Sequence, residues 1–136
     1  MGMKDKTKKP RKVGERRMRS LTRRVLKHWR RNVILSEEAK ETGCEVKLWS
    51  TVNGGFSKRG EDCAYCNVFV HDQNISNKDH CIGCPIRLDT GRVGCNRTPW
   101  LSADAWKPKT IWTEYMYLLN VAYSQGLQPT LKEQNG

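Results

Sequence analysis

The sequence contains no long apolar run and has a modest share of apolar residues overall. Hydrophobic residues make up 37% of the 136 residues, and no stretch approaches the roughly 20 apolar residues that a bilayer-spanning helix requires. The first twenty residues are basic and no apolar segment follows them, so the pattern of a secretory signal peptide is missing. These absences predict a cytoplasmic chain with no membrane partner.

The motifs of common catalytic sites are also missing. There is no glycine-rich phosphate loop and no nucleophile elbow, and the acids in residues 32–136 are scattered rather than paired for acid and base catalysis. His71 and His80 lack the H-x-E arrangement of zinc deaminases. Asp79-His80 resembles part of an HNH nuclease site, but His80 abuts Cys81 directly, and the fourteen residues between Cys66 and Cys81 leave little room for a catalytic hairpin. We therefore predict a binding protein, not an enzyme, with no small-molecule substrate.

Acidic residues are nearly absent from the N-terminal part of the chain. Residues 1–31 hold 14 Lys+Arg against two acids, a net charge of +12, whereas residues 32–136 hold 11 against 12, a net charge of −1. Residues 1–14 have almost nothing apolar to bury, so we expect a basic disordered tail there. The asymmetry points to a polyanion as the partner of this end of the chain.

Residues 15–35 have the periodicity of an amphipathic helix. Apolar side chains repeat at the spacing of one helix face, and cations occupy the opposite face. No acid follows Glu15 in this segment, so ion pairs within the helix do not explain the cations, although a merely solvated face is the alternative. The expected core stripe is Met18, Leu21, Val25, Leu26, Trp29 and Val33. The expected phosphate contacts are Lys8, Lys9, Arg11, Lys12, Arg16, Arg19, Arg23, Arg24, Lys27, Arg30 and Arg31.

Further elements follow along the chain. Ser36 is a plausible cap for a restarted helix that Gly43 would end, and residues 45–52 alternate like a short strand. Residues 110–124 predict a second long helix, with Thr110 as its cap and Gly126 just beyond its end. We expect its core face to be Ile111, Trp112, Tyr115, Met116, Leu118, Leu119, Ala122 and Tyr123. Residues 127–136 are expected to form a frayed end.

Two cysteine pairs give the strongest local signal. Cys63-Ala64-Tyr65-Cys66 and Cys81-Ile82-Gly83-Cys84 are separated by fourteen residues. A C-x2-C turn aims two sulfurs at one metal, and two such turns complete the tetrahedron that structural Zn²⁺ accepts. Gly83 supplies the backbone freedom that such a turn requires. The spacing therefore predicts one structural zinc ion held by Cys63, Cys66, Cys81 and Cys84.

Other potential ligands leave alternatives open. Cys95 lies eleven residues after Cys84 and either replaces Cys81 as a ligand or packs as a small buried thiol. Cys44 is expected to be a plain thiol, and His71 and His80 to lie at the surface or beside the site. An iron–sulfur cluster uses the same ligands as zinc and is the second choice of cofactor.

These observations predict a small, metal-stabilised α+β fold. Two main helices, about 15–35 and 110–124, would pack on a loop-rich zinc-knuckle module within a single domain spanning 15–126. A globular part of roughly 90 residues has a marginal core of its own. Structural zinc can supply on the order of 10 kcal/mol of folding free energy, which would order the module at residues 60–100.

The motif Cys63-x2-Cys66, Cys81-x2-Cys84-Pro85-Ile86, Thr90-Gly91, Cys95, Thr98-Pro99-Trp100 resembles a group of small zinc-finger-like proteins encoded by bacteriophages and some bacteria. The resemblance covers roughly residues 25–120. It implies a metal-stabilised, phage-type accessory protein acting in the cytoplasm of a bacterial host. The Lys/Arg tail is an addition to the pattern of the group.

Two functions compete at this stage. In the first, the chain binds DNA or RNA by neutralising phosphates with its N-terminal tail and helix. In the second, it is a protein-binding module that docks on a host machine such as RNA polymerase, the ribosome or a defence complex. Trp49, Trp100 and Trp106 lie in loop-like segments, where they either anchor an interface or pack against the knuckles.

Overall fold

A computed structural model of the chain describes residues 13–42, 57, 63–71, 80–92, 95 and 98–128. Its elements are α1 (Glu15–Thr42), α3 (Ala64–Cys66), the π-helical turn η2 (Asn67–His71), α4 (Pro85–Thr90) and α5 (Pro108–Ser124). The described residues are mostly helical and contain no strand, so the β part of the predicted α+β fold is not seen among them. The predicted strand at 45–52, Cys44 and the tail cations Lys8, Lys9, Arg11 and Lys12 lie outside the described residues.

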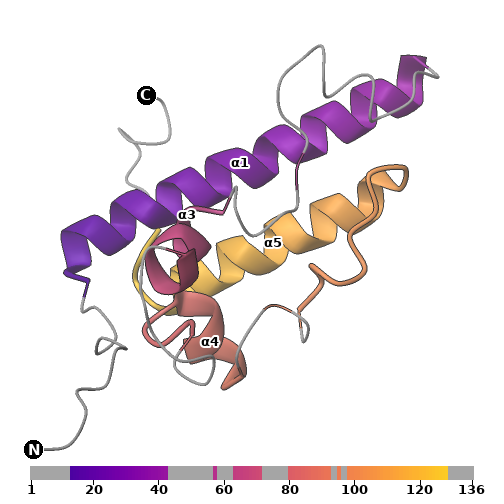
Figure 1. The fold of residues 1–136 in the computed structure, drawn as a ribbon. Helices are drawn as coiled ribbons and strands as arrows, with labels where there is room; N and C mark the ends of the chain where they lie inside the picture. The colour runs from indigo at the N-terminus through magenta and orange to yellow at the C-terminus, as the bar shows by residue number, and fades with distance from the viewer. Residues whose placement is uncertain are drawn as a thin grey trace, which may run out of the picture.

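The two long helices form the body of the molecule. α1 and α5 lie side by side and run in opposite directions (Figure 1). The short helices α3 and α4 lie at the end where α1 begins and α5 ends (Figure 1). α3 contacts α1, and α4 contacts α5, so each cysteine pair is attached to a different long helix.

One hydrophobic core joins these elements. It consists of one stripe of each long helix and apolar residues from the segments around the cysteine pairs. Five of the six residues in the predicted α1 stripe are buried, and Met18 packs against them half-buried. The buried hydrophobic residues of the described chain are Leu21, Val25, Leu26, Trp29, Val33, Leu35, Ala39, Tyr65, Val68, Phe69, Cys81, Cys84, Ile86, Ala103, Ile111, Leu118, Val121, Ala122 and Leu127.

α1 is longer than its periodicity predicted. It continues without interruption to Thr42, so the predicted restart at Ser36 is wrong. Ser36 is buried inside the helix, and its hydroxyl donates a hydrogen bond of 2.5 Å to the backbone oxygen of Ala105. The Ser36 hydroxyl therefore bonds to a backbone oxygen far away in the sequence and does not cap a new helix. The helix ends directly before Gly43, where its end was predicted.

α5 begins slightly earlier than expected and buries a narrower face. Lys107, not Thr110, precedes its first residue, and the Thr110 hydroxyl instead donates to the Lys107 oxygen at 2.7 Å. The buried face is Ile111, Glu114, Leu118, Val121 and Ala122, whereas Trp112, Met116 and Tyr123 are 49%, 38% and 57% exposed. The prediction that these three belong to the core is therefore wrong.

The end of α5 matches its prediction more closely. Gly126 follows the helix with a φ of +67°, the left-handed conformation expected beyond a helix end. Leu127, which was assigned to a frayed terminus, is buried, and its N–H donates to the Ala122 oxygen at 2.8 Å. In the described part of the chain, no helix has both the length and the apolar character needed to cross a bilayer.

Candidate metal centre and nucleic-acid interface

The first cysteine pair lies at the start of α3. Cys63 is extended and directly precedes the helix, and its backbone oxygen accepts the Asn67 N–H at 3.0 Å. The hydrogen bond from the Cys66 thiol lowers the pKa of Cys63 to about 7, against the opposing effect of its burial. The same bond raises the pKa of the Cys66 thiol, and burial raises it further. One thiolate is thus stabilised by the thiol beside it.

The second pair forms a tight turn before α4. Cys84 donates its N–H to the Cys81 oxygen at 2.8 Å, and Pro85 begins the helix. Gly83 has a φ of +87°, which confirms the expectation of unusual backbone angles at this residue. Cys81 also has a positive φ, +69°, which is uncommon for a residue with a side chain. Spacing alone did not predict this second left-handed residue.

Three hydrogen bonds hold the two turns together and against the long helices. The Cys81 N–H donates to the Phe69 oxygen at 3.1 Å, which links the second turn to the segment after the first. The hydroxyls of Tyr65 and Thr22 lie 2.5 Å apart, which connects the first turn to α1. Gln125, at the end of α5, donates from Nε2 to the Pro85 oxygen at 2.8 Å. The turns are therefore placed by both long helices.

The thiols share one electrostatic environment. Burial raises the pKa of Cys84, and the neighbouring Cys81 and Cys63 raise it further. Burial also raises the pKa of Cys95 to about 12, with contributions from Cys63, Glu114 and Cys81. Thiolates bind metals, and several of them in one place repel one another unless a cation compensates. The chemistry of this donor set therefore fits a thiophilic divalent metal such as zinc.

The thiols do not form a closed site as they stand. Within the described segments, no three or more Cys, His, Asp or Glu side chains are arranged to hold a metal ion. Cys95 is half-buried beside the core, so both it and Cys81 remain candidates for the fourth ligand. His80 is half-buried, and its backbone oxygen accepts the Arg87 Nη1 donor at 2.6 Å. The four-cysteine ligand set therefore stays a prediction.

The cations of α1 lie where the sequence placed them. Arg16, Arg23, Arg24, Lys27, Arg30 and Arg31 are exposed. The side chain of Arg19 is 40% exposed, and its Nη2 lies 3.3 Å from Oε1 of Glu15. Arg17, which the periodicity argument left out, is exposed as well. We call these eight residues the cationic face.

The cations of α1 repel one another along the helix. Positions 16–31 hold eight Lys and Arg residues and no acid, whereas Glu37, Glu38 and Glu41 lie near the C-terminal end. Arg19 and Arg23, Arg23 and Lys27, and Lys27 and Arg31 are each spaced i, i+4, and like charges at this spacing destabilise a helix by roughly 0.2–0.5 kcal/mol per pair. The cationic face is thus costly for the helix, which argues for a purpose other than stability.

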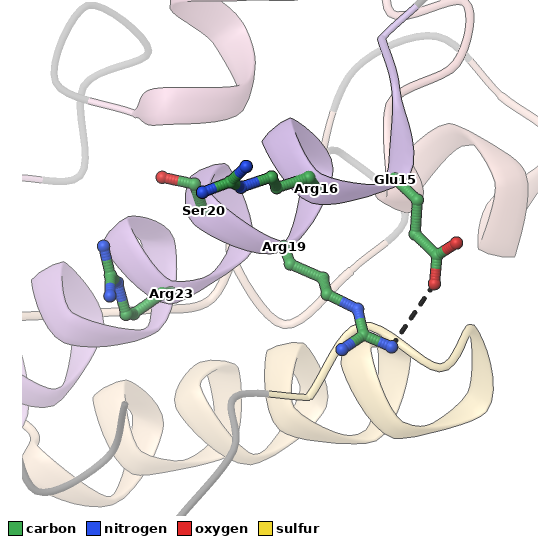
Figure 2. Close-up of a pocket in the computed structure, with 5 residues that line it drawn as sticks. All are labelled: Glu15, Arg16, Arg19, Ser20 and Arg23. Carbon is green, nitrogen blue, oxygen red and sulfur yellow. Dashed lines mark hydrogen bonds and ion pairs between the residues drawn. The ribbon is translucent and has the colours of Figure 1, made fainter. Parts of the chain in front are cut away.

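A pocket opens along the first turns of α1. The described residues that line it are Glu15, Arg16, Arg19, Ser20 and Arg23, and its volume is about 840 Å³ (Figure 2). The close-up shows Arg16, Ser20 and Arg23 along one side of the helix and Arg19 reaching to Glu15 on another (Figure 2). The cationic periodicity predicted the arginines of this pocket but not Ser20. Ser20 lies four residues after Arg16 and three before Arg23, and this spacing indicates that it shares a helix face with them.

Buried polar residues were also missed by the sequence argument. Asn32 exchanges two hydrogen bonds with the backbone of Ser57, as donor at 2.7 Å and as acceptor at 3.2 Å. Glu114 is buried in the middle of α5. Apolar periodicity carries no signal for Asn32, because its partner Ser57 lies 25 positions away in the chain.

No protein-family profile, curated protein or solved structure matches this chain.

Proposed function

We propose that this chain is a zinc-stabilised nucleic-acid-binding accessory protein of phage type. The cationic face of α1 carries the proposal. It presents eight Lys and Arg residues over positions 16–31 with no acid among them, so that like charges repel one another along the helix. Phosphates along a nucleic acid would neutralise these cations and release counterions. Such contacts position a protein on DNA or RNA without reading the sequence.

The cysteine pairs support the proposal by holding this helix in place. Tyr65, inside the first pair, bonds Thr22 in the middle of the cationic segment. Cys63, Cys66, Cys81 and Cys84 would hold one Zn²⁺, with Cys95 as the substitute for Cys81. A site closed by four thiolates leaves no open position for water or substrate. The metal would therefore have a structural role, and the protein would act by binding.

Binding across a salt series tests the function. Fluorescence anisotropy with generic duplex DNA and single-stranded RNA, between about 50 and 200 mM salt, should give a log–log slope of about −5 if roughly six phosphates are engaged. α1 buries residues from Leu21 to Ala39 in the core, so substitution is preferable to deletion of this helix. Arg24→Gln combined with Lys27→Gln and Arg30→Gln should flatten the slope by about two to three.

The matched control removes cations outside the cationic face. Lys40, Lys107 and Lys109 are all exposed, and replacing these three with Gln should leave the slope nearly unchanged. A wild-type protein without salt-dependent affinity for DNA and RNA would refute the proposed function.

The apolar surface of α5 favours a second function. Trp112, Met116 and Tyr123 are exposed at i, i+4 and i+11, and therefore lie on one strip of the helix. Such a strip is typical of a docking surface for another protein, such as part of a host machine. In that case a partner would remain bound after nuclease treatment, and Trp112→Ser would release it while the charge substitutions on α1 would not.

A further inference from the structure

Two of the three arginines in the pocket on α1 have no partner within the described chain. Arg19 is paired with Glu15, whose Oε1 lies 3.3 Å from its Nη2. Neither Arg16 nor Arg23 makes a hydrogen bond or ion pair with any described residue. The described residues that line the pocket carry three guanidinium groups and one carboxylate, a net charge of +2. The positive charge that Glu15 does not compensate is therefore located on Arg16 and Arg23.

The Ser20 hydroxyl adds a third donor between these arginines. Serine and threonine within helices commonly donate to the carbonyl four residues earlier, as Thr113 does to Lys109 at 2.8 Å. Ser20 makes no such bond to a described residue, although it is half-buried. Its positions relative to Arg16 and Arg23, i+4 and i−3, place all three side chains on one face. Figure 2 shows the Arg16 side chain extending along the helix towards Ser20.

We propose that Arg16, Ser20 and Arg23 form a seat for one phosphate group of a bound nucleic-acid strand. The inference rests on the proposed nucleic-acid binding and locates one contact within it. A guanidinium matches two phosphate oxygens with parallel N–H donors, and the hydroxyl contributes a further one. A volume of about 840 Å³ leaves room for the sugar and base attached to that phosphate. The remaining cations of the face make diffuse contacts with neighbouring phosphates.

The test compares two double variants that remove the same charge. The seat variant, Arg16→Gln with Arg23→Gln, removes both guanidinium groups of the seat. The control variant, Arg24→Gln with Arg30→Gln, removes two exposed cations of the same helix outside the pocket. With single-stranded RNA at fixed salt, the first variant should bind about tenfold more weakly than the second. Ser20→Ala should weaken binding about fivefold while the salt slope stays that of the wild type. Circular dichroism and unfolding midpoints establish that all three variants remain folded.

Each outcome decides a different point. If Arg16→Gln with Arg23→Gln binds as well as the control double variant, binding to the face is diffuse and the seat is refuted. If Ser20→Ala binds like the wild type, the three-donor arrangement is overturned. A wild type that shows no salt-dependent binding refutes the proposed function, and the seat with it.

A second experiment distinguishes an internal phosphodiester from a terminal phosphate as the ligand of the seat. The same RNA is used with a 5′-hydroxyl and with a 5′-phosphate. Equal losses on both RNAs for the seat variant identify an internal phosphodiester as the ligand and support the seat. An affinity gain from the 5′-phosphate that disappears in the seat variant identifies a terminal phosphate and supports it equally.

Discussion

Gly83 is the residue on which the second cysteine turn most depends. Its φ of +87° is strained for any residue with a side chain, and an added Cβ would lie 3.2 Å from Cε1 of Phe69. Phe69 is fully buried and has little freedom to move away. Gly83→Ala should therefore lower the free energy of unfolding by about 1–2 kcal/mol for the backbone alone, and by more for the contact. Urea unfolding followed by circular dichroism measures the loss.

Gly91 provides the matched control for this substitution. Its φ of +72° is similar, but nothing lies within 4 Å of an added Cβ. Gly91→Ala should lower the free energy of unfolding only by the cost of placing a residue with a side chain in the left-handed conformation. Equal losses for the two variants would mean that the contact with Phe69 is unimportant.

Residue-level features were predictable where they depend on neighbours in the sequence. The C-x2-C spacing and the glycine within the second pair together indicated a tight turn with a left-handed residue, and Gly83 has that conformation. The bond between Tyr65 and Thr22 joins residues 43 positions apart, so no local pattern signals it. The same reason explains why Ser36 was read as a cap, since its acceptor lies 69 positions away.

The contact between α4 and α5 includes a group whose stability contribution depends on pH. The Tyr117 hydroxyl on α5 donates to Oδ2 of Asp89 on α4 at 2.5 Å. Burial raises the pKa of Tyr117, and the bond to Asp89 raises it further. The folded state therefore holds this proton more tightly than the unfolded chain. The contribution of Tyr117 to the free energy of unfolding is complete below the pKa of the unfolded chain, about 10, and is lost as the pH rises above that value.

Tyr117→Phe tests this dependence. At pH 8 the variant should be less stable by up to about 1 kcal/mol, because it lacks the hydrogen bond. The difference from the wild type should shrink by about pH 10.5, where the unfolded wild type gains stability by ionising and the variant does not. Asp89→Asn is the control, because it keeps an acceptor but removes the charge that favours the protonated hydroxyl. A difference that stays constant from pH 8 to 10.5 would contradict the assignment.

The helices themselves were predictable to different degrees. α1 has a wide apolar stripe opposite an uninterrupted cationic one, and this contrast predicted which side of the helix is buried. α5 is apolar over most of its circumference, so periodicity could not distinguish the buried side from the exposed one. The packing against α1 and α4 makes that choice, and it leaves Trp112, Met116 and Tyr123 outside the core. The extension of α1 to Thr42 was missed because Ser36-Glu37-Glu38 also fits a helix start.

At the level of the whole molecule, the cysteine turns and the cationic half of α1 occupy the same end (Figure 1). The first turn is bonded to α1 through Tyr65, and the second is bonded to the end of α5 through Gln125. A metal that closes the turns would also fix the angle between the two long helices at that end. Folding of the cysteine module and presentation of the cationic face would then be one process.

This coupling predicts what metal removal does. The purified protein should contain one zinc ion per chain, and chelation should abolish cooperative unfolding, because structural zinc supplies on the order of 10 kcal/mol of folding free energy. Cys63→Ser should have the same effect, whereas Cys44→Ser should be nearly silent. Between Cys81→Ser and Cys95→Ser, the variant that loses zinc identifies the fourth ligand. Salt-dependent binding of DNA or RNA should disappear together with the metal and return when zinc is added back. A metal-free protein that keeps its native circular dichroism spectrum and still binds would show that the thiols pack without a metal and that α1 is held by its apolar stripe alone.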